Sequence, residues 1–209
     1  MIQNKKKVLG VILAGGLSRR MKCQNKFLKK IGDQTIISLI ISKALNQVDK
    51  LIINTHIEKK EVKQFKLPII KDTLNGYHGP LAGILTGMEY AAKRKFKWLF
   101  TFPCDAPFFP DNLVEKILKE AEKKKSNIVI ATSKGRMHPV FGIWSITLKN
   151  SLKNALIKYQ IKKMDIWIEK NNFSVLNFNH NTIDPFFNIN NFEDLEKANE
   201  LYKKNKSRK

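Results

Sequence analysis

Residues 8–21 of the chain read Val8-Leu9-Gly10-Val11-Ile12-Leu13-Ala14-Gly15-Gly16-Leu17-Ser18-Arg19-Arg20-Met21, and Lys26 follows five residues later. An apolar run that ends in two glycines is typical of a buried parallel strand, covered by helices on both faces, that leads into a loop. Glycines let backbone N–H groups approach an anion closely, and Arg and Lys side chains add positive charge. The stretch therefore predicts a polyphosphate site, although its spacing matches neither G-x-G-x-x-G nor G-x-x-x-x-G-K-[ST].

Strand-like and helix-like segments alternate along the chain, which is typical of a parallel α/β sheet. We predict strands at 8–13, 50–55, 68–72, 98–102, 127–131 and 173–178, and a turn followed by a strand at 136–144. We predict helices at 36–46, 80–92, 109–123, 146–159, 163–169 and 192–202, with Thr35 and Asp111 as N-caps. The expected fold is one α/β domain over residues 1–209, a three-layer, mainly parallel, twisted Rossmann-like sheet with helices on both faces. A frayed basic tail is expected at 203–209.

Polar or glycine residues follow the predicted strands at the point where each strand ends. They are Gly15, Gly16, Asn54, Asp72 and Asp105. In open parallel sheets, ligands bind in the crevice at the carboxyl ends of the strands. Because four separate strands end in such residues, we expect them to converge on one site.

Two charged groups are the strongest candidates for chemistry at this site. Lys26 and the pair Arg19-Arg20 follow the glycines, and cations held this close together favour a bound anion over a simple tight turn. Asp105 follows an aromatic-rich strand in Phe102-Pro103-Cys104-Asp105-Ala106-Pro107. A carboxylate beside a polyphosphate site suits Mg²⁺, which needs one or two carboxylates in addition to substrate phosphates. The simpler alternative for Asp105 is a hydrogen bond to its own turn.

Composition restricts the function further. The net charge of +21 suggests nucleic-acid binding, but the basic residues are spread along the chain, and only five of them are arginines, the residue that base readout favours. We therefore predict no specific nucleic-acid partner. No apolar run reaches the roughly 18 residues of a membrane span. Cys23 and Cys104 have no metal-ligand spacing, and we expect a reduced pair in a cytoplasmic protein.

Several motifs together resemble one family. Leu13-Ala14-Gly15-Gly16, Arg20-Met21 and Lys26 resemble the signature loop of nucleotidyltransferases. The segments Pro103-Cys104-Asp105-Ala106-Pro107, Gly79-Pro80-Leu81-Ala82-Gly83, His138-Pro139-Val140-Phe141 and Phe187-Asn188-Ile189-Asn190 are most similar to the molybdenum cofactor guanylyltransferase family. The chain departs from that family's usual loop at Lys22, where glycine is usual, and at Asn25, where aspartate is usual.

The resemblance implies transfer of GMP from GTP to the terminal phosphate of Mo-molybdopterin, giving molybdopterin guanine dinucleotide and pyrophosphate. It implies that GTP contacts Leu13, Ala14, Gly15, Gly16, Lys26, Asn54, Asp72 and Asp105. The implied catalytic residues are Arg20, Lys26 and Asp105, with Asp105 holding Mg²⁺. Asn188 and Asn190, which alternation places on one face of a strand, are implied to bind the pterin together with Lys163.

Alternatives remain open at this point. A molybdopterin cytidylyltransferase would share the same motifs, and a non-catalytic GTP binder would explain Lys22 and Asn25. We assign His138 a structural role, because no paired Ser, Cys or acid is evident in the sequence. We expect a monomer whose further partners are other molybdenum cofactor biosynthesis proteins and acceptor molybdoenzymes.

Overall fold

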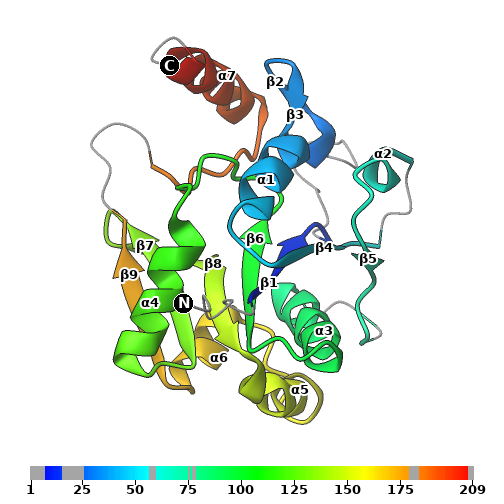
Figure 1. Ribbon diagram of the computed structural model, residues 1–209, viewed down its shortest axis with the longest axis vertical. Helices are drawn as coiled ribbons and strands as arrows, with labels where there is room; N and C mark the ends of the chain where they lie inside the picture. Colours follow the sequence, from blue (N-terminus) through cyan, green and yellow to red (C-terminus); the bar gives the residue numbers. More distant parts are fainter. Residues whose placement is uncertain are drawn as a thin grey trace, which may run out of the picture.

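The computed structural model describes residues 8–15, 26–56, 60–74, 76, 79–178 and 184–206. A seven-stranded sheet forms the centre of the molecule, in the order β5-β4-β1-β6-β8-β7-β9 (Figure 1). Its strands are β1 (Val8–Leu13), β4 (Lys50–Asn54), β5 (Ile69–Ile70), β6 (Trp98–Pro103), β7 (Ile128–Ser133), β8 (Arg136–Ser145) and β9 (Phe173–Asn177). A separate hairpin pairs β2 (Lys30–Ile31) with β3 (Gln34–Thr35).

The first four strands of that order run parallel, since β1 pairs parallel with β4 and β6, and β4 pairs parallel with β5. Strand β8 runs antiparallel between β6 and β7, and β9 pairs parallel with β7 at the sheet edge. The predicted fold, a mainly parallel sheet with helices on both faces, is confirmed.

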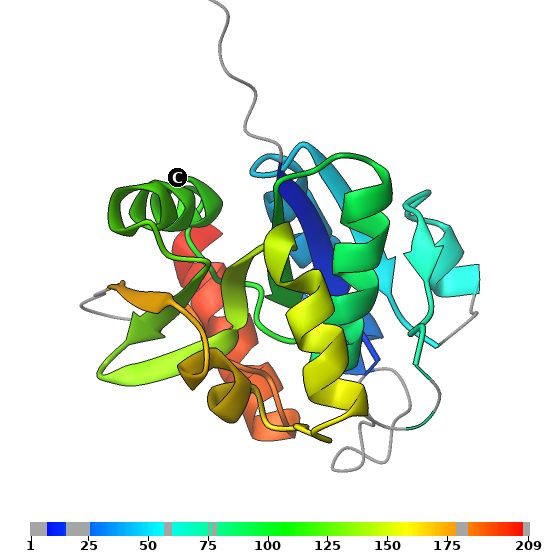
Figure 2. The same ribbon diagram turned by 90° about the horizontal axis from the view of Figure 1, so that it is seen from below.

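Helices cover both faces of the sheet and divide the hydrophobic core into two clusters. One cluster includes residues of α1 (Ile36–Leu45), α4 (Leu113–Lys124) and α7 (Phe192–Lys206). The other includes residues of α3 (Pro80–Lys93), α5 (Lys149–Ile157) and α6 (Met164–Glu169), and Figure 2 shows α3 and α5 side by side on that face. Strand β1 supplies both clusters, because successive side chains of a strand point to opposite faces: Ile12 belongs to the first, Val11 to the second.

Most predicted elements form within a few residues of their expected bounds. Thr35 caps α1 as predicted, because its side-chain oxygen accepts a hydrogen bond from Ser38 N at 3.2 Å. The Asp111 prediction is wrong. Helix α4 begins after Asn112, which makes no side-chain capping bond, and Asp111 instead forms an ion pair of 2.9 Å with Lys43.

Other predictions need smaller corrections. Strand β5 has only two residues, and the stretch expected to open with a turn at Arg136 is strand throughout as β8. The helix predicted over 146–159 divides into a 3-10 turn (Ile146–Leu148) and α5. The hairpin β2–β3, a 3-10 turn (Lys26–Leu28) and the short helix α2 (Lys60–Lys63) were not predicted. Helix α7 extends to Lys206, into the stretch expected to fray.

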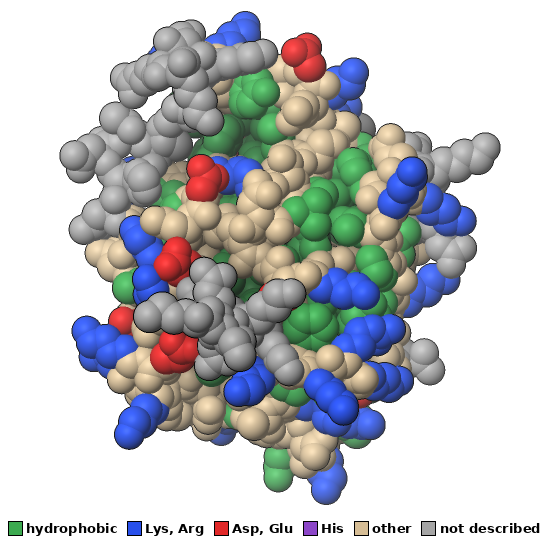
Figure 3. Space-filling view, viewed as in Figure 1, with side chains coloured by type: hydrophobic (Ala, Val, Ile, Leu, Met, Phe, Trp, Pro, Cys, Tyr) green, Lys and Arg blue, Asp and Glu red, His purple; other side chains and the backbone are tan. Residues whose placement is uncertain are grey.

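The surface carries basic side chains in many places. In Figure 3, Lys and Arg side chains lie at several separate positions on the visible face, among hydrophobic and uncharged groups. Among the described residues, no helix combines the length and apolar character that crossing a membrane requires.

Candidate active site

The carboxyl ends of the parallel strands lie at one edge of the sheet. Leu13, the last residue of β1, is level with Asn54 of β4 on one side and with Pro103 of β6 on the other. Asp105 follows the end of β6 by two residues, and Asp72 follows the end of β5 by two residues. The parallel pairing thus brings the predicted strand-end residues to the same edge.

On one side of this edge, Asn54 and His56 hold the carboxylate of Asp72. Asn54 is 4% exposed, and its Nδ2 donates to Asp72 Oδ1 at 2.8 Å. His56 Nε2 lies 3.0 Å from Asp72 Oδ2. Because each carboxylate oxygen has its own partner, the carboxylate is fixed in direction.

Helix α3 packs closely against this group. It begins after Gly79, whose φ of 65° is a left-handed backbone conformation that favours glycine. Farther along the helix, a Cβ at Gly83 would lie 2.8 Å from Leu13 Cδ2 and closer still to Asn54 Oδ1. Gly83 therefore leaves the space that the Asn54 side chain occupies.

Gly15 stands in a different environment. A Cβ at this position would lie 3.9 Å from both Asn54 Oδ1 and His56 Cδ2, which is an ordinary van der Waals distance. The described part of the fold can therefore accommodate a side chain at Gly15. The absence of one leaves room beside the Asn54 and Asp72 pair.

On the other side of the edge, Lys26 joins Asp105 and Asn190. Lys26 Nζ donates to Asp105 Oδ2 and to Asn190 Oδ1, each at 3.0 Å. The side chains of Lys26 and Asp105 are 12% and 23% exposed, so the ion pair is only partly screened by water. Ile189 N donates to the carbonyl oxygen of Asp105 at 2.9 Å, which fixes the backbone before Asn190. A cation and a carboxylate are thus held together at this edge of the sheet.

Cys104 precedes this carboxylate in a setting that disfavours its thiolate form. Burial raises the pKa of its thiol to about 12, and the negative charge of Asp105 adds to the shift. The thiol is therefore neutral at physiological pH. Cys23 lies outside the described residues.

Several predicted residues fall outside the described part of the chain. These are Gly16, Arg19, Arg20, Met21, Lys22 and Asn25. The prediction that Asn188 and Asn190 lie on a strand is wrong, because residues 187–190 form no strand. The two side chains are nevertheless both exposed, on either side of the buried Ile189.

Lys163 lies at the N-terminal end of α6 and is exposed. The neighbouring Lys162 carbonyl oxygen would lie 3.8 Å from a Cβ at Gly79, at the start of α3. The segment that carries Lys163 therefore approaches the start of α3.

Sequence reasoning missed two groups. His56 was not considered, although it follows Asn54 by two residues at a strand end. For His138 no paired Ser or acid was evident in the sequence, and the structure supplies both: its Nε2 lies 2.7 Å from Ser133 Oγ, which in turn lies 2.8 Å from Asp184 Oδ1. The turn Lys134-Gly135 between β7 and β8 was the available signal, because a hairpin there brings Ser133 and His138 together.

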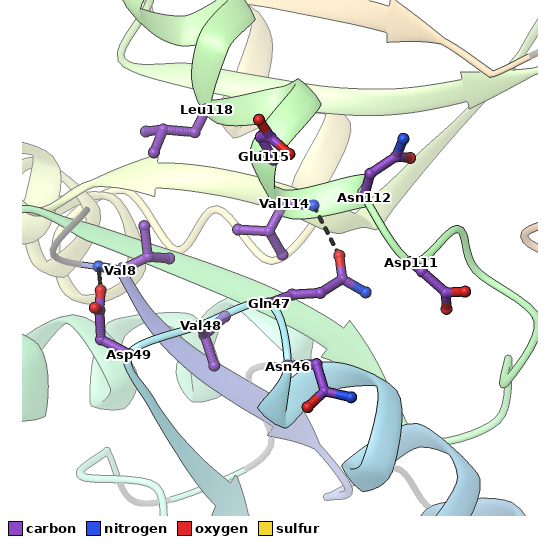
Figure 4. Close-up of a pocket in the computed structure, with 10 residues that line it drawn as sticks. All are labelled: Val8, Asn46, Gln47, Val48, Asp49, Asp111, Asn112, Val114, Glu115 and Leu118. Carbon is purple, nitrogen blue, oxygen red and sulfur yellow. Dashed lines mark hydrogen bonds between the residues drawn. The ribbon is translucent and has the colours of Figure 1, made fainter. Parts of the chain in front are cut away.

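A separate pocket of about 300 Å³ opens at the other end of β1 (Figure 4). It lies between Val8, the segment that joins α1 to β4, and the start of α4. Gln47 bridges two of these elements, since its Oε1 accepts a hydrogen bond from Val114 N at 3.1 Å. None of the predicted site residues lines this pocket.

Comparisons with known proteins identify relatives of this chain. The sequence model of the MobA-like NTP transferase domain matches residues 10–171. The molybdenum cofactor guanylyltransferase of Nitrobacter hamburgensis is 34% identical over 194 residues, covering 92% of this chain and 93% of that protein. The enzyme of the same name from Haemophilus influenzae is 35% identical over 191 residues, covering 91% and 97%.

Solved structures show the same fold. Molybdopterin-guanine dinucleotide biosynthesis protein A from Archaeoglobus fulgidus superposes with a TM-score of 0.74 at 24% identity, covering 94% of this chain and 99% of that one. A CMP:2-keto-3-deoxy-manno-octonic acid synthetase complexed with CTP gives a TM-score of 0.71 at 14% identity, covering 95% and 99%. By the family model and the identity to its curated relatives, the chain belongs to the MobA-like NTP transferases and, among them, to the molybdenum cofactor guanylyltransferases.

Proposed function

We propose that the chain transfers GMP from GTP to the terminal phosphate of Mo-molybdopterin. An oxygen of that phosphate attacks the α-phosphorus of GTP, and the bond from the α-phosphorus to the oxygen bridging to the β-phosphate breaks. The products are molybdopterin guanine dinucleotide and pyrophosphate. The observation that carries the proposal is the contact of Lys26 with Asp105 and Asn190, at the sheet edge that also carries Asn54 and Asp72.

The nucleoside of GTP is assigned to the Asn54 side of the edge. Its contacts are assigned to Leu13, Ala14 and Gly15. Ala14 is held in place because its N–H donates to the Asn54 carbonyl oxygen, and Gly15 leaves room for close approach. The Asp72 carboxylate, held in direction by Asn54 and His56, is an acceptor suited to the N1–H and N2–H groups of guanine. Cytosine lacks this pair of donors, which favours GTP over CTP.

The phosphates are assigned to the Lys26 side. Phosphoryl transfer needs positioning and charge stabilisation more than covalent chemistry, so the Lys26 ammonium serves by binding the charge that develops on the leaving pyrophosphate. Arg20 and Gly16 are proposed to assist from the stretch of sequence before Lys26. Asn25 precedes Lys26 in place of the usual aspartate, yet Lys26 still reaches Asp105, which favours catalysis over GTP binding alone.

Asp105 is the residue that would hold a divalent cation, which we propose to be Mg²⁺. Among the described residues, no cluster of three or more His, Cys, Asp or Glu side chains forms a complete metal site. One partly exposed carboxylate fits a cation that takes its remaining ligands from substrate phosphates and water. When bound, the cation neutralises phosphate charge and orients the phosphates for in-line attack.

The acceptor is assigned to Asn188, Asn190 and Lys163. Asn190 touches Lys26, so a group bound at Asn190 lies beside the phosphates of GTP. Other molybdenum cofactor biosynthesis proteins and acceptor molybdoenzymes are proposed as further partners, in the cytoplasm, because the curated relatives are named as enzymes of this cofactor.

The test is pyrophosphate release with Mg-GTP, with molybdopterin supplied on an acceptor protein, for wild type and Asp105→Ala. We expect release with GTP, little release with CTP, and a loss of at least about 100-fold in the variant, the size typical of a lost electrostatic contact to the transition state. Release with CTP alone would overturn the base assignment. Binding of GTP without release would identify a non-catalytic binder.

A further inference from the structure

We propose that Ser133, His138 and Asp184 form a hydrogen-bond relay that positions residues 184–190, and with them Asn190, for the acceptor substrate. The inference deepens the proposed function and rests on it, because Asn190 is assigned there to the acceptor. These three are positioning residues, since none of them belongs to the group around Lys26.

The distances settle the direction of the relay. Ser133 Oγ lies 2.7 Å from His138 Nε2 and 2.8 Å from Asp184 Oδ1. A serine hydroxyl has one proton, and a carboxylate only accepts, so Ser133 donates to Asp184 and accepts from His138. Nε2 of His138 therefore carries a proton. Burial lowers the pKa of His138, which favours the neutral ring, and the contact with Ser133 places its proton on Nε2.

The relay is not a nucleophilic triad. In hydrolase triads the carboxylate holds the histidine, and the histidine takes the proton of the serine. Here the carboxylate accepts from the serine, and Ser133 is only 1% exposed. A substrate cannot reach this hydroxyl, so the group serves structure and placement.

Asp184 organises the backbone that follows it. Its Oδ1 also accepts from Phe186 N at 2.9 Å, and its carbonyl oxygen accepts from Phe187 N at 3.1 Å. The turn directs the Phe186 ring, which is 2% exposed, onto Phe141 and His138 at centroid distances of 4.8 and 4.7 Å. His138 thus holds the segment both through the relay and through its ring face.

The other end of the segment reaches the site. Ile189 is fully buried and bonds through its N–H to the Asp105 carbonyl oxygen, and Asn190 accepts from Lys26. Residues 184–190 form no helix or strand of their own, so their path depends on these attachments. The relay attaches the start of residues 184–190 to the paired strands β7 and β8. Ser133 belongs to β7, and His138 of β8 pairs with Ala131 of β7. Loosening that attachment lets Asn190 move away from Lys26.

The first test measures the segment without any substrate. We expect Ser133→Ala to speed hydrogen exchange of the Ile189 amide by about tenfold or more, because the buried charge-assisted bond to Asp184 is lost. His138→Gln keeps an N–H donor near the Nε2 position. This variant should therefore keep most of the exchange protection that Ser133→Ala loses. The matched control is Ser145→Ala, which removes a buried serine at the far end of β8. Equal exchange at Ile189 in wild type and Ser133→Ala would overturn the proposal.

The second test uses transfer kinetics. Ser133→Ala should raise KM for the molybdopterin acceptor about five- to tenfold and change KM for GTP less than twofold, whereas Ser145→Ala should change neither. Asp184→Asn keeps a carbonyl acceptor in the same place. Its KM for the molybdopterin acceptor should lie between the values of wild type and Ser133→Ala. Equal effects on both KM values would mean general destabilisation and overturn the positioning role. If wild type shows no transfer, the proposed function fails, while the exchange result still decides whether the relay places the segment.

Discussion

At the scale of single residues, a substitution at Gly15 should change GTP binding without changing the stability of the fold. A Cβ there meets only contacts of 3.9 Å, whereas a Cβ at Gly10 would lie 2.8 Å from Leu51 Cδ1. We expect Gly15→Ala to keep the thermal midpoint within about 2 °C but to weaken GTP binding about tenfold or more, because the methyl group occupies the room left for the nucleotide. Thermal melts and calorimetric titration with GTP measure the two effects.

Gly10→Ala is the matched control for that experiment. It should lower the thermal midpoint, because the buried strand β1 must move its neighbours to admit a methyl group. A Gly15→Ala variant that unfolds as early as Gly10→Ala, or that binds GTP as wild type does, would contradict the role given to Gly15.

His138 gives stability a dependence on pH. Burial lowers the pKa of its imidazole below the ordinary 6.5; the Asp184 carboxylate opposes this shift and Arg136 adds to it. As the pH falls below 6.5, the unfolded chain binds a proton at this ring before the folded protein does. The stabilisation from the neutral ring is therefore complete above pH 6.5 and is lost as the pH falls below it.

The measurement is the free energy of unfolding by urea at pH 8 and at pH 5.5, for wild type and His138→Gln. Glutamine does not titrate, so the stability advantage of wild type over the variant should shrink between these two values. An advantage that stays constant or grows at pH 5.5 would show that His138 is not held neutral in the folded protein.

Some site residues could be predicted from the sequence because one structural rule places them. Asn54, Asp72 and Asp105 were predictable because parallel strands end at the same edge of a sheet. The relay of Ser133 with Asp184 was not predictable, because 51 positions separate the two residues and no local pattern joins them. His56 was missed because an isolated histidine after a strand has no motif around it.

At the scale of elements, α3 packs closely against Asn54 because it has a glycine, Gly83, at the point of contact. A Cβ at Gly83 would lie 2.8 Å from Leu13 Cδ2 and would collide with the Asn54 amide. Alanine gains about 1 kcal/mol in helix propensity over glycine, but overpacking costs about 1–3 kcal/mol, so we expect Gly83→Ala to be destabilising. Displacement of Asn54 should also weaken GTP binding about tenfold, which a titration with GTP would measure.

Gly87→Ala provides the control within the same helix. Its Cβ would lie 3.0 Å from Leu99 Cδ2, in the core behind the site and away from Asn54. We expect it to lower stability while leaving the affinity for GTP within about twofold of wild type. Equal GTP affinities for Gly83→Ala and Gly87→Ala would refute the claim that α3 places Asn54.

Element length explains which elements could be predicted. The strand at Val8–Leu13 and the helix at Ile36–Leu45 have enough residues for an apolar pattern and a cap to be recognised. The strands of the β2–β3 hairpin have two residues each, too few for alternation to appear. The antiparallel insertion of β8 between β6 and β7 depends on pairing between distant strands, which composition does not specify.

At the scale of the whole molecule, we predict that the net charge of +21 attracts anions in general and selects no nucleic acid, because basic side chains lie at separate positions on the face shown in Figure 3. We expect a random 20-base-pair duplex to bind at 50 mM salt and to lose affinity about 100-fold or more by 200 mM, because such binding is driven by counterion release. Fluorescence anisotropy measures this, with Mg-GTP as the ligand whose affinity should change less. Tight duplex binding at 200 mM salt would instead support a nucleic-acid function.

The two clusters of the core pack on opposite faces of one sheet. We therefore expect them to unfold together. Trp144 and Trp167 stack at a centroid distance of 5.7 Å in the cluster under α3 and α5, whereas Trp98 packs against the other cluster. In Trp98→Phe, tryptophan fluorescence therefore reports one cluster, while far-UV circular dichroism reports helices on both faces. Because β1 contributes side chains to both clusters, neither can lose its packing without disturbing the strand that supports the other. We expect the two signals to give the same urea midpoint, as for a single cooperative domain, and separate midpoints would divide the chain into two folding units.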